Sequence, residues 1–439
     1  MMVDYLEPAH IANEVYQFKP DIVGISSVAP EADVMHQVAA EIRKVSQCKT
    51  VAGGPYVSSC PEMVLHDPNI DYIVIGEGEY AFAELVEAIL SDRDVSHIEG
   101  IGYRSKGYFQ RTQPREYIHD LDNVPFPAWD LIKYKEYGKH WRGNILQPRR
   151  TYMALMTSRG CPYQCIYCHK VLGKKFRARS PENVYAEIKT LYSVYSIRDF
   201  EILDDVFNLD KDRAMRICDL IIDSGIKVNL SFAAGLRGDL MDEELLDKLH
   251  RAGAYQISYA VETASSRLQT YIQKNIDLHK IERIIEKTYD RGITTWGFFM
   301  LGFPTETEEE MEETGRFALR AKLDMASFFI VTPLPDTRLR QIAETTGKNT
   351  DISSRESSFW YGNSNLSSVE DRKLYVFQRN FFVKFYINPK RVFRYFRLFS
   401  KFPHKRVILT YCILFIAKTF FSINRSQKWH RLLYKLKPL

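Results

Sequence analysis

The feature that most constrains the fold is an alternation of strands and helices that runs from residue 151 to residue 337. Six short apolar strands are predicted there, and the segments between them place apolar residues at helical spacing, as in QISYAVET (256–263) followed by HKIERIIEKTYDRG (279–292). Strands that are joined through helices pair in parallel. Because a complete eight-stranded barrel usually needs about 250 residues, we expect a partial (β/α)6 barrel over residues 151–340, with its active site at the carboxyl ends of the strands.

The first 103 residues show a shorter series of the same kind. Predicted strands DIVGISSV (21–28), KTVAGG (49–54) and DYIVIGEGE (71–79) alternate with helical segments such as ADVMHQVAAEIRKVS (32–46). The fold class is therefore α/β, with an incomplete Rossmann-like parallel sheet ahead of the barrel. Ligands of such sheets bind at the carboxyl ends of the strands. Small residues gather at these ends, where they either admit a ligand or only make the turns: Ser26, Ser27, Gly53, Gly54, Gly76 and Gly78.

Two further regions complete the predicted organisation. Residues 104–150 are rich in Pro, Arg and aromatic residues, as in LDNVPFPAWDL (121–131), and are expected to form an ordered connector. Residues 341–439 are expected to form a basic, aromatic-rich helical tail. From Arg372 onward there are 17 Lys and Arg residues and no Asp or Glu, whereas the chain before it has 43 basic and 55 acidic residues. The net charge of +5 therefore combines an acidic body with a strongly basic tail.

The basic tail is compatible with three roles. Its longest apolar run, Val407–Ala417, has eleven residues, and a spanning helix needs about 20. Peripheral contact with an anionic membrane surface is one role, and covering the barrel with helices whose Lys and Arg side chains reach outward is another. Binding of RNA ranks third, so we expect no nucleic-acid partner.

Three of the seven cysteines occur within eight residues, CPYQCIYC, as Cys161, Cys165 and Cys168. A structural zinc site uses four ligands, usually as two pairs, and the neighbouring His169 is poorly placed to be the fourth. A cubane iron–sulfur cluster needs one ligand per iron, so three thiolates would leave one iron open. The spacing favours a cluster over zinc or chance. The remaining cysteines are scattered and the chain does not open with a secretory signal, so we expect a reduced, cytoplasmic compartment.

C-x3-C-x2-C after the first strand of a strand–helix series resembles the signature of radical S-adenosylmethionine (radical SAM) enzymes, and the resemblance covers about residues 150–337. GFFMLGFPTET (297–307) and TPLPDT (332–337) resemble two further motifs of that family, with Asp336 in place of a usual Gly. VETAS (261–265) resembles G-I-E-S-G, with Val261 in place of Gly. The family match implies three cluster ligands, Cys161, Cys165 and Cys168, and the following SAM contacts: Tyr167, Asp204, Asp205, Arg237, Glu262, Gly302 and Pro304.

The N-terminal part resembles the cobalamin-binding domain that precedes many such barrels, with LDNVPFPAWDL as the usual connector. Relative to that domain the chain looks truncated, because it begins at what matches the second strand, Met2–Leu6. The D-x-H-x-x-G motif of some cobalamin proteins is absent, and the nearest match, Asp277-Leu-His279, lies in the barrel. The six small residues named above are the implied cobalamin contacts. A domain that only packs against the barrel is the alternative.

These resemblances imply a [4Fe-4S] cluster that reductively cleaves SAM to a 5′-deoxyadenosyl radical, with the barrel orienting the cofactor. The expected reaction is cobalamin-dependent methylation of an unactivated carbon. A cobalamin-independent oxidation, cyclisation or rearrangement is the first alternative, and a non-catalytic iron–sulfur binding protein is the second. The expected partners are a small, hydrophobic substrate and an electron donor such as flavodoxin or ferredoxin. The sequence does not identify the substrate.

Overall fold

The structure is a computed structural model that describes residues 7–105, 107–137, 151–348 and 365–399. The chain folds into two compact units, each built from separate stretches of sequence. The N-terminal unit comprises Met1–Pro125, Gly160–Arg177 and Thr332–Ser364. The barrel unit comprises Phe126–Arg159, Ala178–Val331 and Asn365–Leu439. The two units are described separately below.

The N-terminal unit is built on a five-stranded sheet in the order β1-β2-β3-β4-β5. Its strands are β1 (Ile22–Ser26), β2 (Lys49–Gly53), β3 (Tyr72–Val74), β4 (Ile101–Ser105) and β5 (Tyr108–Arg111). Its helices are α1 (Pro8–Phe18), α2 (Ala32–Val45), α3 (Pro55–Ser59), α4 (Pro61–Leu65), α5 (Glu79–Leu90) and α13 (Arg338–Thr345). The first three strands are parallel, as the sequence predicts for a Rossmann-like sheet.

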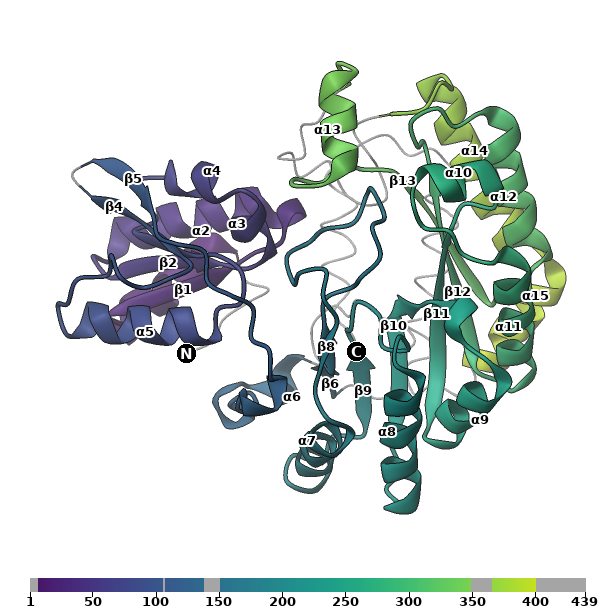
Figure 1. Ribbon diagram of the computed structural model, residues 1–439, viewed down its shortest axis with the longest axis horizontal. Helices are drawn as coiled ribbons and strands as arrows, with labels where there is room; N and C mark the ends of the chain where they lie inside the picture. Colours follow the sequence, from purple (N-terminus) through teal and green to yellow (C-terminus); the bar gives the residue numbers. More distant parts are fainter. Residues whose placement is uncertain (1–6, 106, 138–150, 349–364, 400–439) are drawn as a thin grey trace. The chain divides into compact units, whose positions relative to one another are not determined.

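Alternation along these strands buries both faces of the sheet. Ala52 and Ile73 pack against α2, α3 and α4, whereas Val51 and Val74 pack against α5. Figure 1 shows α2 and α5 on opposite sides of the purple sheet. The strands β4 and β5 form an antiparallel hairpin that extends the sheet, so the predicted domain end at residue 103 falls inside β4.

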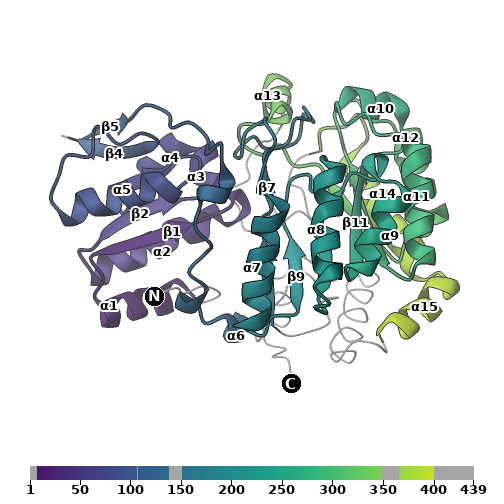
Figure 2. The ribbon, with the colours of Figure 1, turned by 60° about the horizontal axis from the view of Figure 1, so that its bottom comes forward.

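The barrel unit is built on six parallel strands in the order β13-β12-β11-β10-β9-β6. These are β6 (Tyr152–Leu155), β9 (Asp199–Ile202), β10 (Asn229–Leu236), β11 (Ala254–Glu262), β12 (Thr294–Leu301) and β13 (Met325–Ile330). The helices are α6 (Tyr134–Tyr137), α7 (Pro181–Ser193), α8 (Lys211–Asp223), α9 (Glu243–Arg251), α10 (Ser266–Tyr271), α11 (Leu278–Asp290), α12 (Glu308–Arg320), α14 (Asp371–Tyr386) and α15 (Pro389–Phe399). The predicted six-stranded partial barrel is confirmed, and Figure 2 shows α7, α8, α9 and α11 along its outside.

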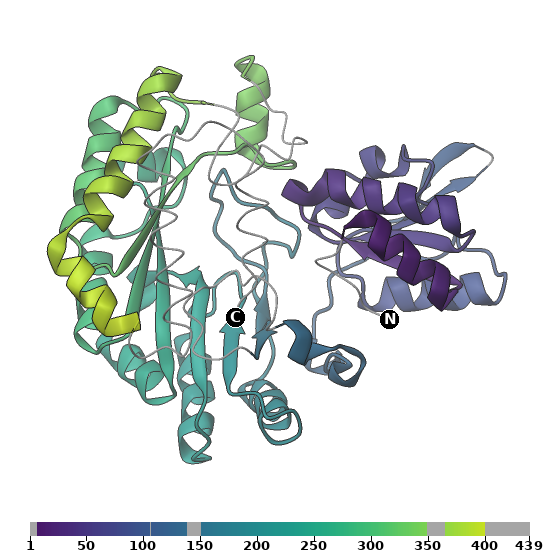
Figure 3. The same cartoon turned by 180° about the vertical axis from the view of Figure 1, so that it is seen from behind.

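The last described helices complete the barrel's hydrophobic core. Phe381 and Phe382 of α14 are buried beside Phe328 of β13, and the Gln378 amide donates to the Phe328 carbonyl over 2.7 Å. Figure 3 shows α14 running next to α12. The first part of the predicted helical tail is therefore a packing element of the barrel, while residues 400–439 lie outside the described residues.

Candidate cofactor sites

The three cysteines lie on a loop that begins after β7 (Ser158–Arg159) and returns through β8 (Arg177–Ala178), the two strands pairing with each other. Cys161, Cys165 and Cys168 are all partly exposed. The Cys168 amide donates to the Cys165 carbonyl over 3.1 Å, which makes a tight turn between the last two cysteines. The start of α13 also holds the loop, because the Leu339 amide donates to the carbonyl of buried Ile166 over 2.8 Å.

The two legs of the loop meet at a glycine. Gly160 has a φ of +79°, and a Cβ atom there would lie 2.3 Å from the Lys175 carbonyl oxygen. Any side chain at this position would therefore force the legs apart. The Cys161 amide then donates to the Gly173 carbonyl over 3.3 Å. Close packing of the two legs therefore fixes the backbone position of Cys161, the first cysteine of the loop.

The loop carries three thiols at a spacing that favours an iron–sulfur cluster. No three His, Cys, Asp or Glu side chains in the described ranges form a site for a single metal ion. A cubane cluster presents a different iron to each thiolate, so its ligands need not converge on one point. Burial raises the pKa of Cys218 to about 12 and also raises that of Cys60, so those two thiols are poor ligands compared with the partly exposed loop.

The carboxyl edge of the parallel N-terminal strands is built from the small residues that the sequence singled out. The Tyr56 amide donates to the Ser27 carbonyl over 3.0 Å, and the Ser27 amide donates to Gly53 over 3.3 Å. Gly54 has a φ of +92°, and a Cβ atom there would lie 2.6 Å from the Ser26 hydroxyl oxygen. A Cβ atom at Gly76, in contrast, would meet nothing within 4 Å. Backbone hydrogen bonds therefore connect the segments of this edge, and the space beside Gly76 is open.

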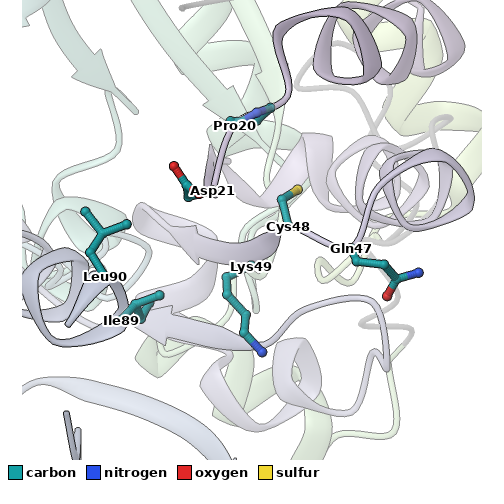
Figure 4. A pocket seen from close by; sticks show the side chains of 7 residues that line it. All are labelled: Pro20, Asp21, Gln47, Cys48, Lys49, Ile89 and Leu90. Atoms are coloured by element: carbon teal, nitrogen blue, oxygen red, sulfur yellow. The ribbon is translucent and has the colours of Figure 1, made fainter. Parts of the chain in front are cut away.

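A cavity of about 470 Å³ lies at the opposite, amino-terminal edge of this sheet. Figure 4 shows its lining residues, which come from the starts of β1 and β2 and from the end of α5: Pro20, Asp21, Gln47, Cys48, Lys49, Ile89 and Leu90. None of them belongs to the predicted cofactor contacts. The cavity is therefore separate from the candidate cobalamin edge.

In the barrel unit, the predicted SAM contacts other than Tyr167 follow four adjacent strands and so share one edge of the sheet. The two neighbouring aspartates after β9 differ in role. Asp204 is buried and accepts hydrogen bonds from the Thr157 amide (2.6 Å), the Thr157 hydroxyl (2.5 Å) and the Ser158 hydroxyl (2.6 Å). This side chain ties the segment after β6 to the end of β9. Asp205 is exposed, so it is the better candidate for a ligand contact.

Glu262, at the end of β11, forms a buried ion pair that the sequence reading missed. Its φ is +65°, and its Oε1 lies 3.2 Å from the Lys274 ammonium nitrogen, with both side chains about one-tenth exposed or less. Arg237, which follows β10, is held by Asp239 through contacts of 3.1 and 2.7 Å. Both candidate SAM contacts are therefore oriented by an oppositely charged neighbour.

The loop after β12 carries Gly302 and Pro304, and it is organised by Glu306. The amides of Gly302 and Phe303 donate to Glu306 Oε2 over 2.6 and 3.0 Å. Burial raises the pKa of Glu306 to about 8 in spite of these two donors. A buried, proton-holding carboxyl thus shapes the backbone of the loop that carries two of the predicted SAM contacts.

One departure from the family motifs and one partial motif match have structural explanations. Asp336, which replaces a Gly, has a φ of +56°, a conformation that Asp tolerates better than most residues. The Asp277 of the Asp277-Leu-His279 sequence caps α11 by accepting from the amides of His279 and Lys280, each over 3.0 Å. That sequence is consequently a helix start in the barrel rather than a cobalt-binding motif.

Family models and known proteins match both parts of the chain. The radical SAM superfamily model matches residues 155–318, and the B12 binding domain model matches residues 3–86. An uncharacterized methyltransferase of Pyrococcus horikoshii is 32% identical over 387 residues, which cover 87% of this chain and 82% of that protein. The chain belongs to the radical SAM superfamily. It is therefore a radical SAM enzyme whose family uses a [4Fe-4S] cluster and SAM.

Two further known proteins are similar to this radical SAM enzyme over most of its length. The cytidylyl-2-hydroxyethylphosphonate methyltransferase of Streptomyces wedmorensis is 29% identical, over 75% of this chain and 67% of that protein. The radical SAM methyltransferase TsrM from Kitasatospora setae, solved with cobalamin and a [4Fe-4S] cluster, has a TM-score of 0.63 at 20% identity, covering 77% of this chain and 67% of TsrM. The likeness to TsrM shows a shared fold. None of the helices in the described ranges has the length and apolar character needed to cross a bilayer.

Proposed function

We propose that this radical SAM enzyme is a cobalamin-dependent methyltransferase that acts on an unactivated carbon of a small, hydrophobic substrate. The observation that carries the proposal is the composition of the N-terminal unit. The cysteine loop, Gly160–Arg177, folds in one compact unit with the sheet that matches the B12 binding domain. If the sheet served only to pack against the barrel, its carboxyl edge would not need open space beside Gly76. It would also not need to share a compact unit with the cysteine loop.

Each cofactor has its own residues in the proposal. Cys161, Cys165 and Cys168 ligate the cluster, and Tyr167 contributes to the SAM site. The remaining SAM contacts are Asp205, Arg237, Glu262, Gly302 and Pro304, with Asp204 supporting the strand ends. Cobalamin lies against Ser26, Ser27, Gly53, Gly54, Gly76 and Gly78. When bound, the cluster and SAM supply radical chemistry and cobalamin supplies a methyl group; the protein orients these groups and excludes water.

We also infer the remaining organisation and partners from the sequence. The boundaries at residues 103, 150 and 340 are proposed to separate regions of different function. The two compact units each combine segments from both sides of these boundaries. An external one-electron donor such as flavodoxin or ferredoxin reduces the cluster, because the chain carries only one cysteine cluster of this type. Peripheral contact of the basic tail with an anionic membrane is proposed from composition alone.

Metal analysis tests the proposal most directly. We expect anaerobically reconstituted enzyme supplied with hydroxocobalamin to hold about four irons and one cobalt per chain, and to release 5′-deoxyadenosine with dithionite and SAM. The triple variant of Cys161, Cys165 and Cys168 to Ala should lose the iron and the deoxyadenosine and keep the cobalt. Iron without cobalt would leave a cobalamin-independent radical SAM enzyme and remove the methyltransferase proposal. Deoxyadenosine from the triple variant would contradict the cluster assignment.

A further inference from the structure

The N-terminal unit contains a buried ion pair that no cofactor assignment above uses. Glu77 follows β3 in the sequence IGEGE, and Arg177 ends the cysteine loop, 100 residues later. Their side chains are 4% and 3% exposed, which is the lowest exposure of both partners among the described ion pairs. Charged groups are seldom buried this fully unless the pair has a specific task, because desolvation offsets most of the attraction.

The Arg177 guanidinium joins three segments. One terminal nitrogen lies 2.8 and 2.9 Å from the two Glu77 carboxylate oxygens and 2.7 Å from the Ile118 carbonyl oxygen. The other terminal nitrogen donates to the Leu172 carbonyl over 2.8 Å. The Ile118 amide in turn donates to Glu77 over 2.7 Å. The strand-end loop of the sheet, the segment that leaves the β4–β5 hairpin and the returning leg of the cysteine loop therefore meet at one guanidinium.

A second line of contacts leads from this guanidinium to the first cysteine. Arg177 lies over the Tyr117 ring, 4.8 Å from its centroid. The ring packs against Gly173, where a Cβ atom would come within 2.9 Å of Tyr117. The Gly173 carbonyl accepts from the Cys161 amide over 3.3 Å. A shift of Glu77 or Arg177 is thus transmitted through rigid, closely packed groups to a cluster ligand.

The opposite side of the ion pair leads to the candidate cobalamin edge. Glu77 stands between Gly76 and Gly78, and the Gly76 amide donates to the Ser58 hydroxyl over 2.9 Å. Ser58 donates to the Gly54 carbonyl over 3.0 Å. The ion pair is therefore connected on one side to the strand-end loops and on the other side to the cysteine loop.

We propose that Glu77 and Arg177 are positioning residues that fix the cysteine loop to the carboxyl edge of the N-terminal sheet, and so set the placement of the cluster with respect to the cobalamin face. This inference rests on the proposed function for the identity of the two cofactors. The mechanical part, the attachment of the loop to the sheet, follows from the contacts alone. Neither residue is a catalytic residue.

The test uses the full-length chain and four variants. Glu77→Gln and Arg177→Met each remove one charge, and the double variant removes both without leaving a buried unpaired charge. Arg177→Lys keeps the charge but cannot reach Glu77, Ile118 and Leu172 with one rigid fork. Arg43→Met is the matched control, because Arg43 of α2 pairs with Asp71 over 2.7 Å in the same unit, and its hydrogen bonds go to Cys48, Asn69 and Asp71 rather than to the cysteine loop.

Amide hydrogen exchange of residues 160–177 and the rate of iron loss to a chelator are the readouts, both without turnover. We expect Glu77→Gln, Arg177→Met and the double variant to raise both rates about tenfold or more, and Arg177→Lys to do so as well. Arg43→Met should leave both rates at the wild-type value even where it lowers the melting temperature. The double variant keeps the test decisive if a single variant fails to fold. Unchanged exchange and iron loss in the folded variants would overturn the proposal.

A cobalamin titration separates this inference from the proposed function. Bound hydroxocobalamin should slow iron loss from the wild-type cluster, and the double variant should lose this protection while still binding cobalt. If the wild type binds no cobalamin, the proposed methyltransferase fails, and the faster loop exchange of the variants still upholds the attachment. Wild-type protection that persists unchanged in the double variant would overturn the coupling between the two cofactor segments.

Discussion

At the scale of single residues, neighbours of the same type carry different tasks. Asp204 accepts three hydrogen bonds that join two strand ends. Asp205, one position later, is exposed. Glu306 shapes a loop as a buried carboxyl, and Glu262 is held by Lys274. In each case the backbone geometry and the burial decide the role, and the residue type alone does not.

The two aspartates should separate in a binding experiment. Because Asp205 is exposed, Asp205→Asn should leave the melting temperature unchanged, while loss of a charge-assisted hydrogen bond should weaken SAM binding about tenfold or more. Asp204→Asn replaces a carboxylate that accepts from three donors, so it should lower the unfolding free energy by about 1–3 kcal/mol. Calorimetric SAM titration and urea unfolding measure the two effects. Equal SAM affinity in wild type and Asp205→Asn would exclude Asp205 from the site.

Gly160 should be sensitive to a single added methyl group. Gly160→Ala places a Cβ atom 2.3 Å from the Lys175 carbonyl oxygen at a φ of +79°, so the legs of the cysteine loop must separate. We expect iron content after reconstitution to fall well below that of the wild type. Gly292→Ala is the matched control, since Gly292 has a φ of +77° and a Cβ atom there meets nothing within 4 Å. Full iron occupancy in Gly160→Ala would show that the loop tolerates the separation.

Glu306 should make stability depend on pH. Burial raises the pKa of Glu306 to about 8 in the folded protein. In the unfolded chain a glutamate titrates near about 4.3. The folded state therefore binds more protons between these pH values, and the unfolding free energy should fall as the pH rises from about 5 to 8. Glu306→Gln cannot titrate and should lose this part of the slope in urea unfolding. Glu313→Gln, at an exposed position, controls for the lost charge; parallel wild-type and Glu306→Gln curves would refute the assignment.

At the scale of elements, the predicted alternation holds well where apolar spacing is regular. The predicted strand 256–263 and the predicted helix 279–292 fall within two residues of β11 and α11, because each of these elements packs into the barrel core. The antiparallel β4–β5 hairpin, in contrast, lies where an extended connector was expected. Its exposed strand β5, Tyr108–Arg111, shows no alternating apolar pattern that could have revealed it.

The ion pair between Arg394 and Asp324 should stabilise helix α15 on the barrel. Arg394 contacts both carboxylate oxygens of Asp324, whose side chain is fully buried, and its guanidinium lies 3.2 Å from the centroid of the Tyr289 ring. Arg394→Met leaves a buried carboxylate without its cation, which should lower the unfolding free energy by about 3 kcal/mol. The double variant Asp324→Asn/Arg394→Met should recover part of this loss. Arg216→Met, which breaks an exposed pair with Glu182, should cost less than about 1 kcal/mol.

At the scale of the whole molecule, the compact units do not follow the order of the sequence. The cysteine loop and α13 fold with the N-terminal sheet, although both are encoded after the start of the barrel. Local periodicity cannot reveal this, because it reports on neighbours along the chain. The Glu77–Arg177 and Glu262–Lys274 pairs were missed for the same reason, whereas the cysteines were found because their spacing is itself the signal.

The basic tail gives a prediction for the entire chain. With 17 Lys and Arg residues and no acidic residue after Asp371, the full-length protein should sediment with vesicles that contain anionic lipid at low salt. A chain ending at residue 399 should bind much less, because nine of these 17 cationic residues lie beyond it. Binding should also weaken as salt screens the charges. Equal sedimentation with neutral vesicles would contradict an electrostatic contact.

The partnership of Glu77 with Arg177 also has a consequence for how the chain is made. These residues are 100 positions apart, and ribosomes add about 5–20 residues per second, so the arginine is synthesised roughly 5–20 seconds after the glutamate. During that interval the sheet of the N-terminal unit lacks the Arg177 guanidinium, so Glu77 in the loop after β3 has not yet formed its ion pair. The N-terminal unit is thus completed late in translation, after the cysteines have left the ribosome. Nascent chains that stop before residue 177 should therefore lack the contact that ties Glu77, beside the proposed cobalamin edge, to the cysteine loop.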